Sequence, residues 1–278
     1  MSDSRSKYLP ANNLNVKYKN ELNRKLDIQK LNPTEQNVLM SLFSTLKDQE
    51  DREISIGFDK FREMANVSSK DFTNEELKPL IETTLSKIGS QTIHLENDNI
   101  SAIFPLFDKI IIDKTRYNIT YRVSELFKDY FNYFVKEYVS FPLIDFVKIK
   151  GKYTKNLYKI LMQFKNTGVY QEDYEEFLYK VMGAPTTLKV FKGANQIVKP
   201  ATQELKKIGY FQELEFSFTK NNKKIKNIIF NFKVATPNPE SLKIIKDDEL
   251  RASIKEKEEA RQRELEETIR IAKTPWIE

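Results

Sequence analysis

The fold of this chain is decided by residues 188–210, LKVFKGANQIVKPATQELKKIGY, whose two faces differ when the segment is wound as a helix. One stripe is apolar and consists of Phe191, Ala194, Val198, Ala201, Leu205 and Ile208. The opposite stripe carries Lys192, Gln196, Lys199, Gln203 and Lys206 and no carboxylate, with Glu204 between the two stripes. Such a helix can bury one face, and its other face is either simply solvated or suited to phosphates and adenine edges.

Basic residues are concentrated in the middle of the chain. The 278 residues carry a formal net charge of +6. Residues 147–164 contain five lysines and no acidic residue, and a second cluster consists of Lys220, Lys223, Lys224 and Lys226. The distribution predicts a polyanionic partner. Nucleic acid is favoured over anionic lipid because no segment joins this charge to an exposed aromatic and leucine face.

The composition also bears on compartment. The opening stretch, MSDSRSKYLP, lacks the apolar core of a signal peptide, and no window holds the roughly 20 apolar residues that a membrane span needs. The absence of cysteine excludes a disulfide framework, a thiolate zinc site and a cysteine nucleophile. These features together predict a cytoplasmic protein without membrane contacts.

The first half of the chain predicts an arm, three helices and then strands. Residues 1–20 are polar with little periodicity and are expected to form a flexible arm. The patterns that follow predict helices at 32–46, 58–65 and 74–88, and strands at 53–56, 91–95, 100–104 and 108–121 with a turn at 97–99. A further helix is expected from Ser124, its N-cap, to about residue 133. The order is that of a winged helix with one hairpin, and it also suits several small α+β domains.

A similar order recurs after Gly151. The next helix has an apolar face formed by Leu157, Ile160, Leu161 and Phe164, and a basic face formed by Lys152, Lys155 and Lys159. A short helix at 172–181 precedes the segment quoted above, and two strands alternating through 214–218 and 228–232 predict a hairpin with lysines at its tip.

These patterns predict an α+β fold with two winged-helix domains, each a three-helix core with a β-hairpin wing. The expected organisation is a flexible arm at 1–20, an N-terminal winged helix at 21–148, a C-terminal winged helix at 149–236 and a charged helical or disordered tail at 237–278.

Four stretches resemble the iteron-binding replication initiator proteins of plasmids, a family with tandem winged-helix domains. The stretches are GKYTKNLYKILMQFKNTG (151–168), EEFLYKVMGAP (175–185), KVFKGANQIVKPATQELKKIG (189–209) and the hairpin ending in IIFNFK (228–233). A weaker likeness begins at about residue 20, so that the resemblance covers roughly residues 20–233.

The resemblance implies a sequence-specific double-stranded DNA-binding protein. It would bind directly repeated iterons as a monomer, open adjacent AT-rich DNA and recruit host replication proteins such as a helicase or its loader. In this family dimers repress transcription or block initiation. The first domain is therefore expected to mediate dimerisation and contact part of each repeat, and the second to read the rest.

The expected DNA contacts lie on three elements. The residues on the helix after Gly151 and on the wing are expected to contact the DNA backbone. The residues on the recognition helix, within 189–206, are expected to approach the bases, with Gln196 and Lys199 closest. The residues are Lys152, Lys155, Lys159, Lys189, Lys192, Asn195, Gln196, Lys199, Gln203, Lys206, Lys223, Lys224 and Lys226. Pro200 lacks an N–H, which predicts a bend or a helix start between Lys192 and Pro200.

The sequence offers no enzyme site. His94 is the only histidine, so the histidine cluster of a rolling-circle nickase is missing. Gly151-Lys152 is followed by Tyr153 and lacks the earlier glycine of a phosphate loop. The acidic residues of the tail alternate with Lys and Arg, as in a solvated helix. We expect a non-enzymatic initiator without metal or cofactor, the alternatives being a winged-helix transcriptional repressor and an adaptor that binds proteins through its charged C-terminal helix.

Overall fold

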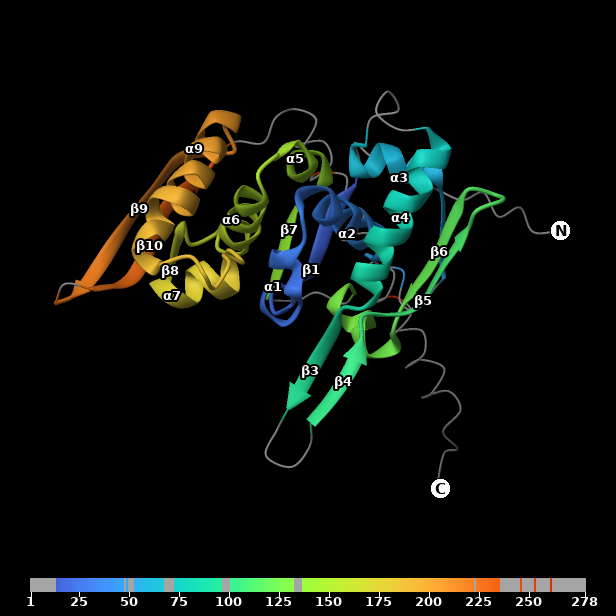
Figure 1. Cartoon of the computed structure of the whole chain (residues 1–278), viewed down its shortest axis with the longest axis horizontal. Helices are drawn as coiled ribbons and strands as arrows, with labels where there is room; N and C mark the ends of the chain where they lie inside the picture. The colour runs from blue at the N-terminus through green and yellow to red at the C-terminus, as the bar shows by residue number, and fades with distance from the viewer. Residues whose placement is uncertain are drawn as a thin grey trace, which may run out of the picture.

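Figure 1 shows the computed structural model of the chain. It describes residues 14–47, 49, 53–67, 73–96, 101–132, 137–222 and 224–235, and the single positions 246, 253 and 261. The predicted turn at 97–99, residues 1–13 of the predicted arm and, apart from those three positions, the predicted tail lie outside the described residues.

The first half contains a winged helix. Its helices and strands are α2 (Pro33–Leu46), β2 (Ile54–Gly57), α3 (Phe58–Ala65), α4 (Asn74–Gly89), β5 (Phe107–Asp113) and β6 (Asn118–Val123). The strands form an antiparallel sheet in the order β2-β6-β5. Both long helices begin where local signals predict, because Asn32 and Thr73 form capping boxes with Glu35 and Glu76.

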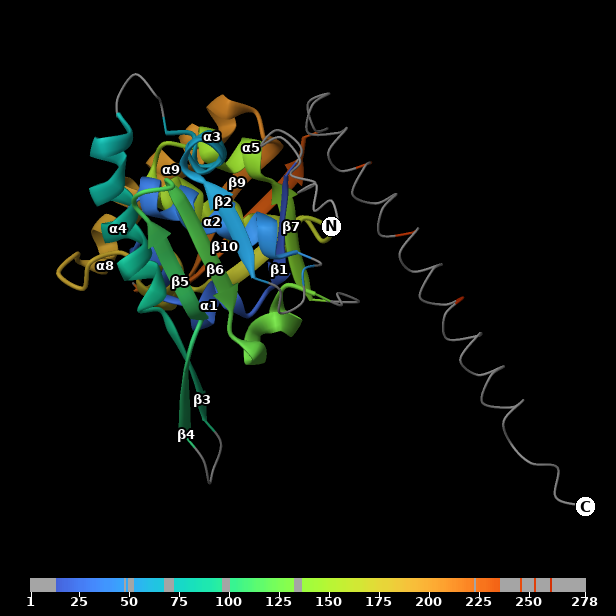
Figure 2. The same ribbon diagram turned by 90° about the vertical axis from the view of Figure 1, so that its right-hand side faces the viewer.

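One hairpin more than expected follows α4. β3 (Thr92–Glu96) pairs with β4 (Ser101–Pro105) in a separate two-stranded sheet, and the predicted strand at 108–121 is divided into β5 and β6. Figure 2 shows β3 and β4 extending away from the rest of the described fold. The helix predicted from Ser124 is the short 3-10 helix η3 (Glu125–Tyr130), and the Ser124 hydroxyl donates to the Pro105 carbonyl instead of capping it.

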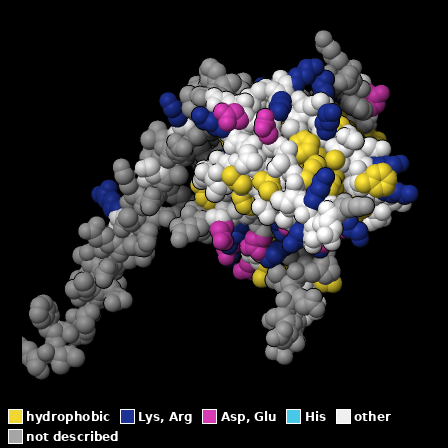
Figure 3. Space-filling view, turned by 90° about the vertical axis from the view of Figure 1, so that its left-hand side faces the viewer, with side chains coloured by type: hydrophobic (Ala, Val, Ile, Leu, Met, Phe, Trp, Pro, Cys, Tyr) yellow, Lys and Arg dark blue, Asp and Glu magenta, His cyan; other side chains and the backbone are white. Residues whose placement is uncertain are grey.

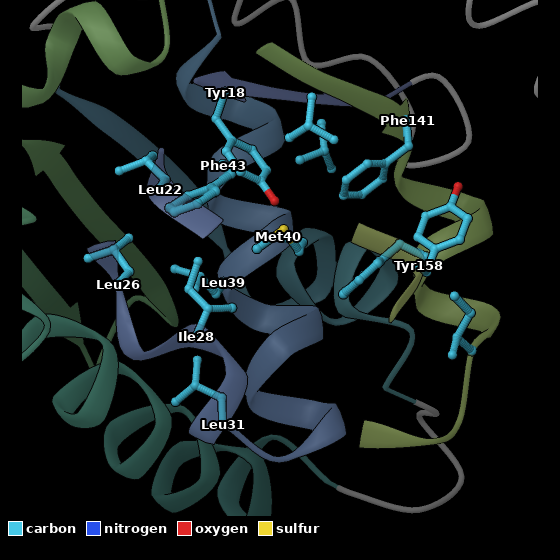
Figure 4. Packing of buried hydrophobic residues seen from close by; sticks show 14 of the residues in the cluster. Tyr18, Leu22, Leu26, Ile28, Leu31, Leu39, Met40, Phe43, Phe141 and Tyr158 are labelled. Atoms are coloured by element: carbon cyan, nitrogen blue, oxygen red, sulfur yellow. The ribbon is translucent and has the colours of Figure 1, made fainter. Parts of the chain in front are cut away.

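The prediction of a flexible arm is wrong for residues 15–19. These residues form β1 (Asn15–Lys19), which pairs antiparallel with β7 (Tyr138–Pro142), and Val16 and Tyr18 are fully buried. Tyr18 packs edge-on against Phe43 of α2, with 5.3 Å between ring centroids (Figure 4). The pairing strand lies more than a hundred residues away, so local polarity did not indicate it. Two short helices, α1 (Leu22–Lys25) and η2 (Asp27–Lys30), connect β1 to α2.

The second half contains another winged helix, preceded by α5 (Leu143–Lys148). Its elements are α6 (Lys152–Gln163), β8 (Val169–Asp173), α7 (Tyr174–Glu176), the π-helical η4 (Phe177–Val181), α8 (Val190–Gly193), the π-helical η5 (Ala194–Val198), α9 (Lys199–Ile208), β9 (Phe211–Asn221) and β10 (Lys224–Val234). The sheet order is β8-β10-β9, so that the two long strands form the wing.

The two halves share one hydrophobic cluster, and α6 lies at its centre. Residues 154–162 are all buried, because α6 packs against α2 and η2 on one side and α9 on the other. Phe141 of β7 packs edge-on against Tyr158 of α6 (Figure 4). The Asn156 side chain donates to the backbone carbonyls of Gln29 and Met182, which joins the halves by polar contacts as well. Among the described residues, no helix is both long and apolar enough to cross a membrane.

Candidate nucleic-acid interface

The segment that opened the sequence analysis is one continuous right-handed helix of changing type. The backbone stays right-handed helical from α8 through η5 into α9, and the Lys199 N–H donates to the Ala194 carbonyl, five residues back. The α-helical pattern restarts at Lys199, within the predicted interval. Pro200 is therefore accommodated by a π-helical turn and not by a break. Gly209, with φ of 83°, ends the helix in the left-handed region.

A close approach to the preceding helix fixes the position of this segment. A Cβ at Gly193 would lie 2.5 Å from Leu178 Cδ1 and 3.0 Å from the Tyr174 hydroxyl. The absence of a side chain at Gly193 thus allows η4 and α8 to touch. Further along, Val198, Ala201 and Leu205 are buried as predicted.

The prediction that Phe191 belongs to the buried stripe is wrong, since its side chain is 68% exposed. A π-helical turn contains more residues than an α-helical turn, so the residues before it are rotated relative to those after it. Gly193 and Ile197 lie on the buried side instead. Phe191 is left on the outside.

The predicted polar stripe is on the surface. All seven predicted residues of the recognition helix are exposed: Lys189, Lys192, Asn195, Gln196, Lys199, Gln203 and Lys206. Within the described part of the chain, none of the four lysines forms an ion pair with a carboxylate. The stripe therefore presents positive charge and amide groups to solvent.

The one carboxylate of this helix is turned inward. Glu204 Oε1 accepts hydrogen bonds from the backbone N–H groups of Lys150 and Gly151, at 2.9 and 3.2 Å. Its Oε2 accepts one from the Thr154 hydroxyl at 2.5 Å. The carboxylate thus satisfies donors at the start of α6, where the helix dipole favours a negative charge. It adds little negative potential to the exposed stripe.

A groove of about 460 Å³ runs between α9 and β9 beside this stripe. It is lined by Lys199, Thr202, Gln203, Lys206, Leu214, Glu215 and Phe216. Glu215 was not predicted as a site residue, although its alternation with buried Leu214 and half-buried Phe216 along β9 could have indicated an outward side chain. Glu215 is the one carboxylate among the residues that line the groove, which include two lysines.

The wing places lysines at its tip. β9 and β10 are 11 residues each and turn at Asn222, whose φ of 55° is left-handed. Lys220, Lys224 and Lys226 are exposed near this turn, while the predicted Lys223 lies outside the described residues. Figure 3 views the end of the molecule that carries this domain, and Lys and Arg side chains lie among hydrophobic ones on the right-hand part of that face.

The predicted basic face of α6 does not exist. Lys155 is fully buried, and its Nζ donates to Asn37 Oδ1 of α2 and to the Phe146 carbonyl, both at 2.6 Å. The same ammonium lies 4.1 Å from the centroid of the Phe146 ring. Burial lowers the pKa of Lys155 to about 7. The prediction that Lys155 contacts the DNA backbone is therefore wrong, because it joins the two halves of the protein.

The other two lysines of α6 are also withdrawn from solvent. Lys159 is 4% exposed, and burial together with the nearby Lys155 charge lowers its pKa to about 7. The prediction is wrong for Lys159 as well. Lys152 is half-buried, its Nζ lies 3.4 Å from the Gly183 carbonyl, and burial lowers its pKa. These positions are covered because α6 packs on both domains, which an amphipathic pattern alone does not indicate.

In the described ranges, no group of three or more His, Asp or Glu residues is arranged to hold a metal ion. His94, the single histidine, lies in β3 opposite Ile103.

Comparisons with known proteins agree with this architecture. The profile of the family described as Initiator Replication protein, WH1, matches residues 15–162. The chain is 22% identical over 223 residues to a probable replication protein rep of Bifidobacterium longum (strain NCC 2705), which covers 80% of this chain and 73% of that protein.

A solved structure has a similar fold. The crystal structure of Pi initiator protein in complex with iteron DNA matches with a TM-score of 0.66 and 14% identity, over 81% of this chain and 99% of that one. At this identity the match shows a shared fold. The family profile covers more than half of the sequence, and the chain therefore belongs to the family of initiator replication proteins.

Proposed function

We propose that this protein is a plasmid replication initiator that binds directly repeated double-stranded DNA at an origin. The observation that carries the proposal is the exposed stripe of α8, η5 and α9, whose three lysines, together with Lys189 just before α8, have no carboxylate partner among the described residues and whose one acid is turned inward. The similarity to an initiator solved with iteron DNA supports the choice of ligand.

The geometry suggests how the second domain meets a duplex. A single helix fits the major groove, which is about 12 Å wide, and the N-terminal part of a recognition helix contacts base edges. Asn195 and Gln196 lie in that part and can pair bidentately with adenine. The lysines of the stripe and those at the wing tip, Lys224 and Lys226, then contact phosphates on either side.

The remaining roles extend this proposal to the whole chain. We assign base reading to residues 149–236, and dimerisation with further DNA contact to residues 21–148. Origin opening draws on binding energy and on host proteins such as a helicase or its loader, because the proposed site has no catalytic groups. A monomer–dimer equilibrium and a cytoplasmic location belong to the same proposal.

Binding to selected DNA tests the proposal. Duplexes selected by the purified protein from a random library are compared with scrambled duplexes at about 150 mM salt, where specific sites are typically ~10³-fold preferred. A preference of this size, with one complex per repeat on tandem copies, supports an initiator. Equal and salt-sensitive binding to both duplexes would leave a basic protein without sequence recognition.

Origin opening separates the initiator from a repressor of the same fold. Selected repeats are joined to an AT-rich segment in a supercoiled plasmid, and unpaired thymines are detected by permanganate. Reactivity that depends on the protein supports the initiator, whereas specific binding without reactivity, in the presence of a host helicase and its loader, favours the repressor.

A further inference from the structure

Phe191 is the most exposed large hydrophobic residue in the described part of the chain, at 68%. It belongs neither to the hydrophobic cluster nor to the partly buried residues that pack against it. An aromatic ring of this size favours removal from water, so that a ligand that covered it would gain binding free energy.

The ring lies in line with Asn195, a proposed base-reading residue, and with exposed polar residues of α9. Phe191, Asn195, Lys199, Gln203 and Lys206 follow one another at intervals of four, four, four and three residues, and all of them are exposed. In an α-helix such intervals drift around the axis, and the extra residue of the π-helical turn between Phe191 and Lys199 offsets that drift, so that these side chains share one face. Phe191 is also in the first turn of α8, the end of the helix that approaches base edges most closely in this class of fold.

The chemistry around the ring limits what can cover it. Its exposed neighbours are donors, Lys189 and Lys192 along the chain and Asn195 one turn on, and Pro200 is the one other exposed apolar residue between residues 186 and 207. A protein partner or a lipid surface would need a wider apolar patch. A duplex offers phosphates to the lysines and, in the major groove, one apolar group, which is the C5-methyl of thymine.

We propose that Phe191 packs against a thymine methyl group in the binding site and so sets the preference for thymine at that position. The inference rests on the proposed function. It gives a physical role to the π-helical turn, which rotates Phe191 out of the core stripe and into the base-reading stripe.

The test is a double-mutant cycle across the interface. Wild type, Phe191→Ala and Phe191→Leu are each titrated with the selected duplex and with duplexes in which single thymines are replaced by deoxyuridine, which lacks only the methyl group. For wild type we expect an affinity loss of about fourfold at one thymine, the effect of exposing one methyl. Phe191→Ala should bind the thymine duplex more weakly and show no loss there, and Phe191→Leu should keep part of it.

Two outcomes overturn the inference in distinguishable ways. If wild type prefers the selected duplex but no deoxyuridine effect depends on residue 191, the inference fails and the proposed function stands. If wild type has no preference for the selected duplex, both fail. Unchanged thermal unfolding of Phe191→Ala, expected for an exposed side chain, shows that any loss of affinity does not come from misfolding.

Discussion

The third helices of the two winged helices occupy equivalent places in the fold and carry opposite surfaces. α4 exposes Glu75 and Glu76 and carries the half-buried Glu82, and its lysines are already paired within the protein: Lys78 with Glu75, and Lys87 with Glu35 of α2. Hydrogen bonds from Lys78 and Tyr117 hold the pKa of Glu75 below its usual range. Helices α8 and α9 instead leave their lysines to solvent. The same architecture therefore presents unpaired positive charge to solvent in the second domain, whereas in the first domain the lysines of the third helix are paired with carboxylates.

Reversing the charge of the exposed stripe should have the largest effect. The combined change Lys192→Glu, Lys199→Glu and Lys206→Glu is expected to lower affinity for any duplex by at least about 100-fold at moderate salt, because phosphate contacts become repulsive. Folding should persist, since all three positions are exposed. Thr83→Glu with Ser86→Glu, which adds two negative charges at exposed positions of α4, is the control for added negative charge on the first domain. An equal loss in both variants, measured by fluorescence anisotropy, would break the comparison.

Lysines in α6 and α9 should differ in their effect on stability. Lys155 has a pKa lowered to about 7 in the folded protein against 10.5 in a free chain, so the unfolded state binds more protons between these values. The contribution of Lys155 to stability is therefore present above pH 10.5 and is lost as the pH falls to about 7. Between these values the free energy of unfolding should fall by up to about 1.4 kcal/mol per pH unit.

Lys155→Met should remove the part of the slope that comes from Lys155 and keep most of the apolar side chain, while Lys159, whose pKa burial also lowers to about 7, keeps its own part. Urea unfolding from pH 7.5 to 9.5, within the window of about 7 to 10 set by the two pKa values, measures it. Lys199→Met, at an exposed position, is the control. A slope unchanged by Lys155→Met would show that the buried ammonium keeps its charge through its bonds to Asn37 and Phe146.

The glycines of the two third helices should respond differently to alanine. A Cβ at Gly193 meets Leu178 at 2.5 Å, whereas one at Gly89 of α4 meets the end of Ile110 at 3.2 Å. Gly193→Ala is expected to destabilise by about 1–3 kcal/mol through overpacking, while Gly89→Ala should change stability by less than about 1 kcal/mol. Equal unfolding midpoints for both variants would mean that η4 and α8 are not held together at Gly193.

Gln196→Ala tests whether Gln196 contacts a base or the DNA backbone. We expect a loss of about 1–3 kcal/mol in the preference for one base pair, because an amide that pairs with a base edge is removed. Binding to duplexes with every substitution at each position locates the effect. A uniform loss at all positions would show that Gln196 contacts only the DNA backbone.

Lys224→Ala should have the smallest effect. The residue is exposed near the tip of the wing. Its replacement is expected to weaken binding to all sequences alike, by less than about tenfold, and to reduce the slope of log affinity against log salt concentration by about one. A change in base preference at the edge of the site would instead place the wing in a groove.

Local signals explain what could be predicted. The capping boxes at Asn32 and Thr73 set the starts of two helices, and the polar stripe from Lys192 to Lys206 follows from helical spacing alone. The errors concern contacts between distant parts. β1 is buried by β7 and α2, and Lys155 is buried because α6 packs on both domains.

The sequence by itself determined the two winged helices, the basic third helix of the second one and its lysine-rich wing, because hydrophobic periodicity, caps and charge act within a few residues. The tertiary structure alone decided which lysines of α6 are buried. It also decided that Glu204 accepts hydrogen bonds at the start of α6 and that Phe191 points outward. These outcomes depend on what packs against each helix, since a side chain's burial is fixed by its neighbours in space and a π-helical turn changes which face they cover.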